Sequence, residues 1–170
     1  SAALMLHIFQ KYSDRIRLCN LAQTINVLQA IIFTEGAKMV KTPTYHLFDL
    51  FKKHQDSYYV PVAWDEKPKT IKMGLPNADI SASASDNGKV FITIVNLSAD
   101  DKAEIVLNFA GRKARSVKGG FISGEVTAHN TFDNPNRVQV QELNDIQVVN
   151  GEALLSLFPC TIAAVEAELE

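Results

Sequence analysis

Four histidines are the side chains best suited to acid–base or metal chemistry near neutral pH, since an unperturbed imidazole titrates in that range. They are His7, His46, His54 and His129, and none has a partner at the spacing of a catalytic triad or a metal site. His7 lies in an apolar helical segment, which favours a hydrogen-bonded core histidine. His46 and His54 are two helical turns apart, so we do not expect them to share a metal ion. The sequence predicts no metal site and no cofactor.

Acidic residues that could serve hydrolysis are scarce in the first third of the chain. Glu35 precedes Gly36 in a predicted turn, and Asp49 falls in the middle of a predicted helix. A turn and the middle of a helix are positions at which acidic side chains mostly face solvent. We interpret both residues as solvated.

Three amides occupy a polar segment that follows a predicted strand. Gln23 is the main candidate for ligand contact, and Asn20 and Asn26 flank it. A neutral amide can both donate to and accept from a sugar hydroxyl. The alternative is that these side chains bond backbone groups of their own loop, and from the sequence pattern alone we favour that alternative for all three.

Aromatic residues near the middle of the chain could stack on a sugar ring. The candidates are Trp64, Tyr58 and Tyr59. Strict alternation would place Tyr58, Val60, Val62 and Trp64 on one face of a strand, which more often indicates the core of a sandwich.

Composition narrows the classes of partner. With 17 basic and 19 acidic side chains the net charge is −2, so no long-range field would attract nucleic acid or an anionic membrane. The two cysteines, Cys19 and Cys160, form no CxxC pair and are interpreted as buried thiols whose pairing the sequence does not reveal. No targeting signal is apparent, and the compartment stays unknown.

The pattern of apolar residues changes near residue 56. Before it, the sequence predicts a helix over Ala3–Tyr12, a short strand over Arg15–Cys19, a second buried apolar run over Val27–Phe33 and a helix from Thr42 to His54. Thr42 is a favourable N-cap and Pro43 a favourable first-turn residue. So few elements cannot bury their own apolar faces. Either the rest of a larger α/β domain covers them, or the following domain or a partner does.

After residue 56 the pattern alternates with period two between frequent turn signals. It predicts strands at 58–64, 78–85, 89–96, 103–109, 113–117, 125–129, 138–141, 153–157 and 161–169. Asp86-Asn87-Gly88 predicts a hairpin turn, and Asn130–Arg137 a long surface loop. Short strands at this spacing favour an antiparallel β-sandwich. The predicted domains are therefore 1–56 and 57–170.

The first of these domains carries a family resemblance. The run Ser13-Asp14-Arg15-Ile16-Arg17-Leu18-Cys19-Asn20-Leu21-Ala22-Gln23-Thr24-Ile25-Asn26-Val27 resembles the final barrel strand and following loop of α-L-arabinofuranosidases of glycoside hydrolase family 51. The blocks Thr34-Glu35-Gly36, Lys38-Met39-Val40 and Thr42-Pro43-Thr44-Tyr45-His46-Leu47-Phe48 resemble the segment up to the last barrel helix. The resemblance implies a mainly β chain, in which a β-sandwich follows the last strand and helices of a (β/α)₈ barrel.

The resemblance also implies a function. A family-51 enzyme removes terminal α-L-arabinofuranosyl groups from arabinan, arabinoxylan or their oligosaccharides with retention, using two glutamates that precede the segment present here. Gln23 is then the residue that contacts the arabinose, and this chain alone is expected to be inactive and to self-associate through its exposed barrel remnant. The alternatives are a non-catalytic carbohydrate-binding or structural sandwich, and a protein-interaction domain that docks through its apolar helix.

Overall fold

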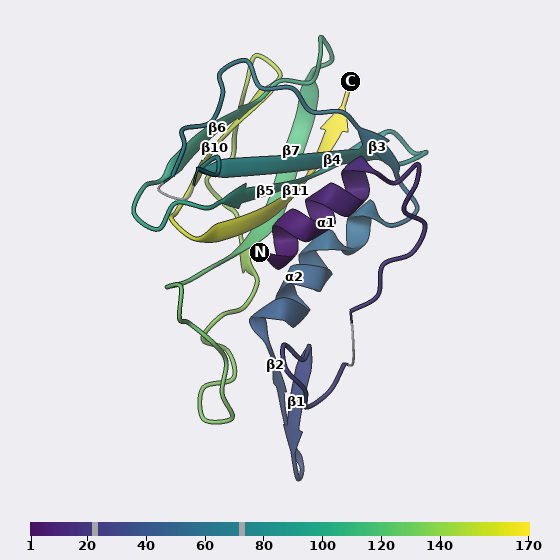
Figure 1. Ribbon diagram of the computed structural model, residues 1–170. Coiled ribbons are helices and arrows are strands. Elements are labelled where there is room, and N and C mark those ends of the chain that lie inside the picture. Colours follow the sequence, from purple (N-terminus) through teal and green to yellow (C-terminus); the bar gives the residue numbers. More distant parts are fainter. Residues whose placement is uncertain (22–23, 72–73) are drawn as a thin grey trace.

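The largest element of the fold is a six-stranded antiparallel sheet (Figure 1). The computed structural model describes residues 1–21, 24–71 and 74–170. In spatial order the strands are β3 (Tyr58–Val60), β4 (Ala78–Ala84), β5 (Lys89–Asn96), β11 (Thr161–Leu169), β7 (Ala114–Ser123) and β8 (Gln141–Glu142). β11 lies at the centre and pairs with both β5 and β7.

A three-stranded sheet packs on one face of the large sheet. Its strands are β6 (Ala103–Leu107), β10 (Glu152–Leu157) and β9 (Gln147–Val149), with β10 in the middle. Alternate aliphatic side chains of both sheets meet between them, and Ile94, Ala163 and Leu157 are almost fully buried there. Burial of this apolar surface is the main favourable contribution to folding.

Two helices cover the opposite face of the large sheet. They are α1 (Ala2–Lys11) and α2 (Pro43–Phe51), and a 3₁₀ turn, η1 (Lys52–His54), extends α2. The side-chain oxygen of Thr42 accepts the backbone N–H of Tyr45, as expected for an N-cap. Leu47 and Phe51 pack against Val95 and Ile122 of the sheet. The molecule thus has three layers: small sheet, large sheet and helices.

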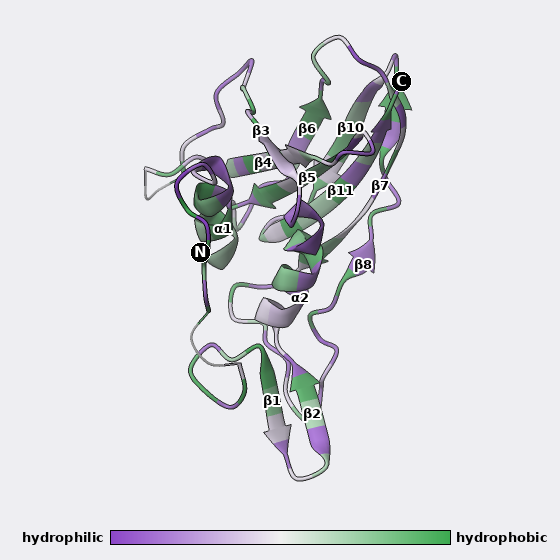
Figure 2. Ribbon diagram, turned by 90° about the vertical axis from the view of Figure 1, so that its right-hand side faces the viewer, coloured by the Kyte–Doolittle hydropathy of each residue, from purple (hydrophilic) through white to green (hydrophobic). Residues whose placement is uncertain are grey.

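A two-stranded hairpin projects from the helical layer (Figure 2). β1 (Ile32–Glu35) and β2 (Lys38–Lys41) are antiparallel, and the turn between them contains Gly36 with a φ of +56°. The hydropathy colouring shows apolar stretches on the hairpin and on both helices. Within the described ranges, no helix is long and apolar enough to cross a membrane.

The predicted antiparallel β-sandwich is confirmed, but the barrel-like strand before it is not formed. Arg15–Cys19 has no strand structure, and in Val27–Phe33, predicted to be buried, Leu28 is 94% exposed. A buried parallel strand requires neighbours on both edges, and no described segment pairs with residues 15–19. Cys19, predicted to be buried, is exposed. The domain boundary at residue 56 stays a prediction.

Some strand predictions after residue 56 are also wrong. β3 ends at Val60 rather than at Trp64, because Pro61 has no N–H to donate to a ladder. Tyr58 is 68% exposed, and Trp64 also lies at the surface rather than in the core. Residues 125–129 form no strand, and β9 was not predicted. β7 continues through Gly119, where a Cβ would clash with the backbone oxygen of Ala164.

Candidate functional site

The segment that connects α1 to β1 contains the predicted ligand-contacting amides. Gln23 lies outside the described residues. Asn20 is exposed and lines a cleft between the helices, which is described below. Asn26 is also exposed and has a φ of +54°, a left-handed conformation that asparagine tolerates better than most residues.

Side-chain hydrogen bonds fix Asn26 to the hairpin. Its Nδ2 donates to the backbone oxygen of Thr34 at 3.2 Å and to Thr34 Oγ1 at 2.9 Å. Its Oδ1 accepts the N–H of Thr34 at 2.8 Å. The predicted role of this residue in satisfying backbone groups is confirmed, whereas contact of Asn20 or Asn26 with a ligand stays a prediction.

The last part of the loop, residues 24–31, is held by further hydrogen bonds to the hairpin and to the start of α2. The backbone oxygen of Thr24 accepts the N–H groups of Ile31 and Ile32 at 3.0 and 3.2 Å. Thr42 Oγ1 donates to the backbone oxygens of Ala30 and Ile31 at 2.8 and 3.1 Å. A loop with few buried residues is thus ordered by polar contacts with its neighbours.

An apolar cleft of about 500 Å³ opens between the two helices and this loop. We call it the apolar cleft. Its walls include Met5 and Phe9 of α1, Leu21 of the loop, and Leu47 and Phe48 of α2. Among the described residues, its lining contains no acidic side chain and no histidine that could act as a general acid or base. Its composition is that of a surface that another apolar surface could cover.

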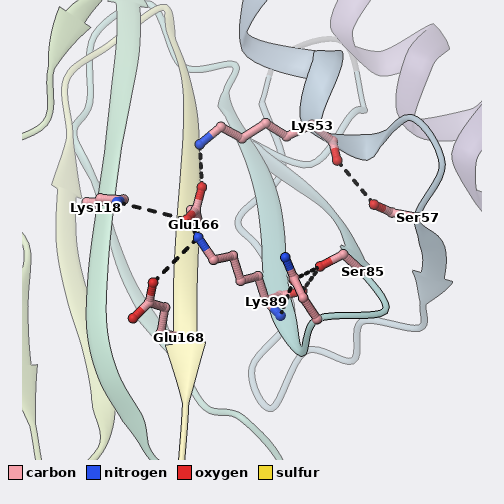
Figure 3. A network of polar contacts seen from close by, with 8 residues as sticks. Lys53, Ser57, Ser85, Lys89, Lys118, Glu166 and Glu168 are labelled. Carbon is pink, nitrogen blue, oxygen red and sulfur yellow. Dashed lines mark hydrogen bonds and ion pairs between the residues drawn. The ribbon is translucent and has the colours of Figure 1, made fainter.

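A second cleft, of about 640 Å³, lies between the end of α2 and strands β7 and β8. We call it the lysine cleft, because its lining includes Lys52, Lys53 and Lys118, the last two of which lie near the carboxylate of Glu166. Figure 3 shows Lys53 of η1, Lys89 of β5 and Lys118 of β7 converging on Glu166.

Glu166 is only 7% exposed and is fully paired. It accepts hydrogen bonds from Lys53 and, at 2.7 Å, from Lys89, and Lys118 Nζ lies 4.0 Å away. The hydrogen bonds from Lys53 and Lys89 lower the pKa of Glu166 to about 2. A carboxylate that stays ionised and bonded in this way is suited neither to donate a proton nor to attack a sugar. We therefore assign it a structural role.

Two histidines lie between the helices and the large sheet. His7 is 4% exposed; its Nδ1 is 2.6 Å from Asp79 Oδ2 and its Nε2 is 2.9 Å from Thr93 Oγ1. The prediction of a hydrogen-bonded core histidine is confirmed. His54 Nδ1 is 2.8 Å from Ser83 Oγ. Burial, with a smaller effect of the neighbouring His7, lowers the pKa of His54 to about 4.

The acidic residues considered from sequence lie at the surface. Asp49 pairs with Lys52 at 2.7 Å, and Glu35 is exposed at the end of β1. The burial of Glu166 was missed. The signal was the period-two pattern of its strand, which places it on the same face as Ile162 and Ala164.

Comparison with known proteins gives consistent matches along the chain. Residues 1–160 match the family model described as the α-L-arabinofuranosidase C-terminal domain. An intracellular exo-α-L-arabinofuranosidase of Bacteroides ovatus is 33% identical over 170 residues, covering 98% of this chain and 33% of that protein.

Solved structures agree with this match. The GH51 arabinofuranosidase from Xanthomonas axonopodis pv. citri superimposes with a TM-score of 0.90 at 31% identity, over 98% of this chain and 34% of that chain. The α-L-arabinofuranosidase from Thermotoga maritima, in a structure described as an arabinose complex, gives a TM-score of 0.84 at 28% identity, over 99% and 37%. The chain spans about a third of the length of these relatives.

The depressed pKa values predict how stability depends on pH. An unfolded His54 takes up a proton near pH 6.5, whereas the folded form resists protonation until about pH 4. The free energy of unfolding should therefore fall as pH drops from 6.5 towards 4, by on the order of 2 kcal/mol from this residue. Glu166 should cause a further loss between about pH 4.5 and 2.

Urea denaturation of the chain at pH 7, 5.5 and 4.5 would measure the fall in the free energy of unfolding that we attribute to His54. His54→Gln should flatten the pH dependence in this range, and His129→Gln, at an exposed position, should not. An unchanged slope in His54→Gln would show that His54 is not the responsible group.

Proposed function

The chain belongs to the α-L-arabinofuranosidase C-terminal domain family, and we propose that it is the C-terminal part of a retaining glycoside hydrolase. The proposed enzyme removes terminal α-L-arabinofuranosyl residues from arabinan, arabinoxylan or their oligosaccharides. The observation that carries the proposal is a match that includes the first 56 residues as well as the sandwich. A free-standing sandwich module would have no need of that segment.

The proposed chemistry requires groups that this chain does not supply. Retaining hydrolysis uses a nucleophile and an acid/base, with carboxyl groups about 5 Å apart. The buried carboxylate of Glu166 is occupied by lysines, and the apolar cleft has no acidic lining residue. We therefore place both catalytic glutamates in the part of the enzyme that precedes this chain.

The apolar cleft and its surroundings supply the surface on which that preceding part would pack. Met5 and Ile8 of α1 and Leu18 and Leu28 of the loop are all largely exposed. Exposed apolar side chains in such number commonly mark an interface. We propose that the remainder of a (β/α)₈ barrel covers them in the full-length enzyme.

Activity tests the proposal directly. The full-length enzyme should hydrolyse an aryl α-L-arabinofuranoside, whereas the purified 170-residue chain should not, since removal of both carboxylates removes nucleophile and acid together. Release of the aryl group is followed by absorbance, with an aryl β-D-xyloside as the control substrate. Turnover by the verified chain alone would refute the proposed division of roles.

The exposed interface predicts that the isolated chain self-associates. Sedimentation velocity over a range of concentrations should detect dimers or larger species. Met5→Glu should reduce association because it places a charge within the apolar surface, and Val106→Glu, on the exposed face of the small sheet, is the matched control. A monomer at all concentrations would contradict this prediction.

Gln23 is the residue that we propose to contact the sugar. Support comes from its place in the motif that resembles the family and from its chemistry, because an amide can donate to one sugar hydroxyl and accept from another without changing protonation. It immediately precedes Thr24, whose backbone oxygen accepts the N–H groups of Ile31 and Ile32. Asn20 and Asn26 are the secondary candidates.

Gln23→Ala in the full-length enzyme should lower kcat/KM by one to two powers of ten, since loss of a neutral hydrogen bond costs about 1 to 3 kcal/mol. Thermal stability should change little. Steady-state kinetics and calorimetry together show whether Gln23 contacts the substrate or only stabilises the fold. Wild-type kcat/KM combined with a melting temperature several degrees lower would make Gln23 a structural residue instead.

A further inference from the structure

A buried amide of the sandwich reaches across to the hairpin. Asn130 lies in the loop of residues 124–140 between β7 and β8 and is 5% exposed. Its Nδ2 donates to the backbone oxygen of Lys41 at 2.8 Å and to that of Val138 at 2.7 Å, and its Oδ1 accepts the N–H of Val138 at 2.7 Å. Both amide protons and the carbonyl are thus bonded to backbone groups.

These bonds join two parts of the chain that are far apart in sequence. Val138 is buried against Leu47 and Ile122 in the core between helices and sheet, so one end of the connection is rigid. Lys41 is the last residue of β2, so the other end is the base of the hairpin. In Figure 1 the loop of residues 124–140 descends beside β1 and β2.

The hairpin in turn holds the loop proposed to face the sugar. Lys41 pairs with Ile32 across the hairpin, and Ile32 donates its N–H to the backbone oxygen of Thr24. Thr34 in the same strand is bonded twice by the side chain of Asn26 and donates its N–H to it. The path from the sandwich to residues 24–26 therefore consists of hydrogen bonds and one pair of strands.

We propose that Asn130 is a positioning residue for sugar binding: by fixing the base of the hairpin to the sandwich, it sets the position of residues 24–31, the last part of the loop before β1. The proposal rests on the proposed function, which assigns sugar contact to the preceding residue, Gln23. Asn130 touches no reacting atom. Small displacements of groups that orient a substrate reduce rates strongly, so a residue at this distance can affect catalysis.

The residue type fits this role. The amide acts at once as donor to two carbonyls and acceptor from one N–H, in a buried position. An aspartate could accept from Val138 but would place its charge against the oxygens of Lys41 and Val138. An alanine would leave three backbone groups without these partners. It would also remove the hydrogen bond that joins the hairpin to the loop of residues 124–140.

The test is the kinetics of the full-length enzyme on an aryl α-L-arabinofuranoside, together with inhibition by L-arabinose. Asn130→Ala should lower kcat/KM about 10-fold and raise the inhibition constant of L-arabinose by a similar factor. Asn130→Asp should be at least as impaired. Asn130→Ser is the milder variant to use if the alanine protein does not fold.

Two controls separate positioning from general destabilisation. Asn96→Ala removes another buried amide, whose bonds run to Asp101, Leu157 and Phe158 within the sandwich, and it should lower the melting temperature without changing the kinetics of the folded enzyme. Asn134→Ala removes an exposed amide from the same loop as Asn130 and should change neither quantity.

Each outcome decides a different point. If the wild-type enzyme does not cleave arabinofuranosides, the proposed function fails. If it does, and Asn130→Ala binds L-arabinose and turns over substrate like the wild type while melting at a lower temperature, Asn130 is purely structural and the inference fails. Faster hydrogen exchange at Ile32 and Thr34 in Asn130→Ala, absent in Asn96→Ala, would support the proposed path directly.

Discussion

The arrangement of the fold depends on the polar contacts between the helices and the second face of the large sheet. That face presents Asp79, Ser83 and Thr93 where an ordinary packing face would be aliphatic, and the helical layer brings His7 and His54 to meet them. Burial of such groups is costly unless each finds a hydrogen-bond partner. Because hydrogen bonds are directional, a shift of α1 by one turn would break both contacts of His7, and a similar shift of α2 with η1 would break the contact of His54. Apolar contacts alone would allow several positions of the helices on the sheet. The hydrogen bonds select one of these positions.

This fixed docking has a consequence for the segment between the helices. α1 and α2 are both anchored to the sheet, the latter also by the ion pair of Lys53 with Glu166. The intervening loop and hairpin are therefore held at both ends by the sandwich. The outward faces of the helices stay available for the apolar contacts expected of a barrel remnant. The helices of the first 56 residues thus pack on the large sheet of the sandwich, although their sequence resembles the end of a barrel.

The sequence predicted the parts of this structure that depend on local patterns. β5 and β11 have their predicted bounds, and α2 begins at the predicted cap, since alternation, turn residues and capping act over a few positions. The prediction of a strand at Arg15–Cys19 was wrong because a buried strand requires neighbouring strands, and no described segment pairs with these residues. Contacts such as Glu166 with Lys53, or Asn130 with Lys41, join residues about a hundred positions apart and follow from topology. Gln23 was selected by resemblance, not by any pattern of its own.

The loop before the hairpin needs these distant contacts for a physical reason. Its described parts, residues 12–21 and 24–31, contain no helix or strand, and long loops without regular elements rarely order themselves. Its large apolar residues, Leu18, Ile25 and Leu28, are exposed in this chain and contribute no core. Backbone groups in it must therefore be satisfied by side chains such as Asn26 and Thr42. A covering domain that buried the apolar residues would add order from the opposite side. The sandwich and that domain would then stabilise the same loop. Loss of the loop's contacts with one of them would weaken its contacts with the other.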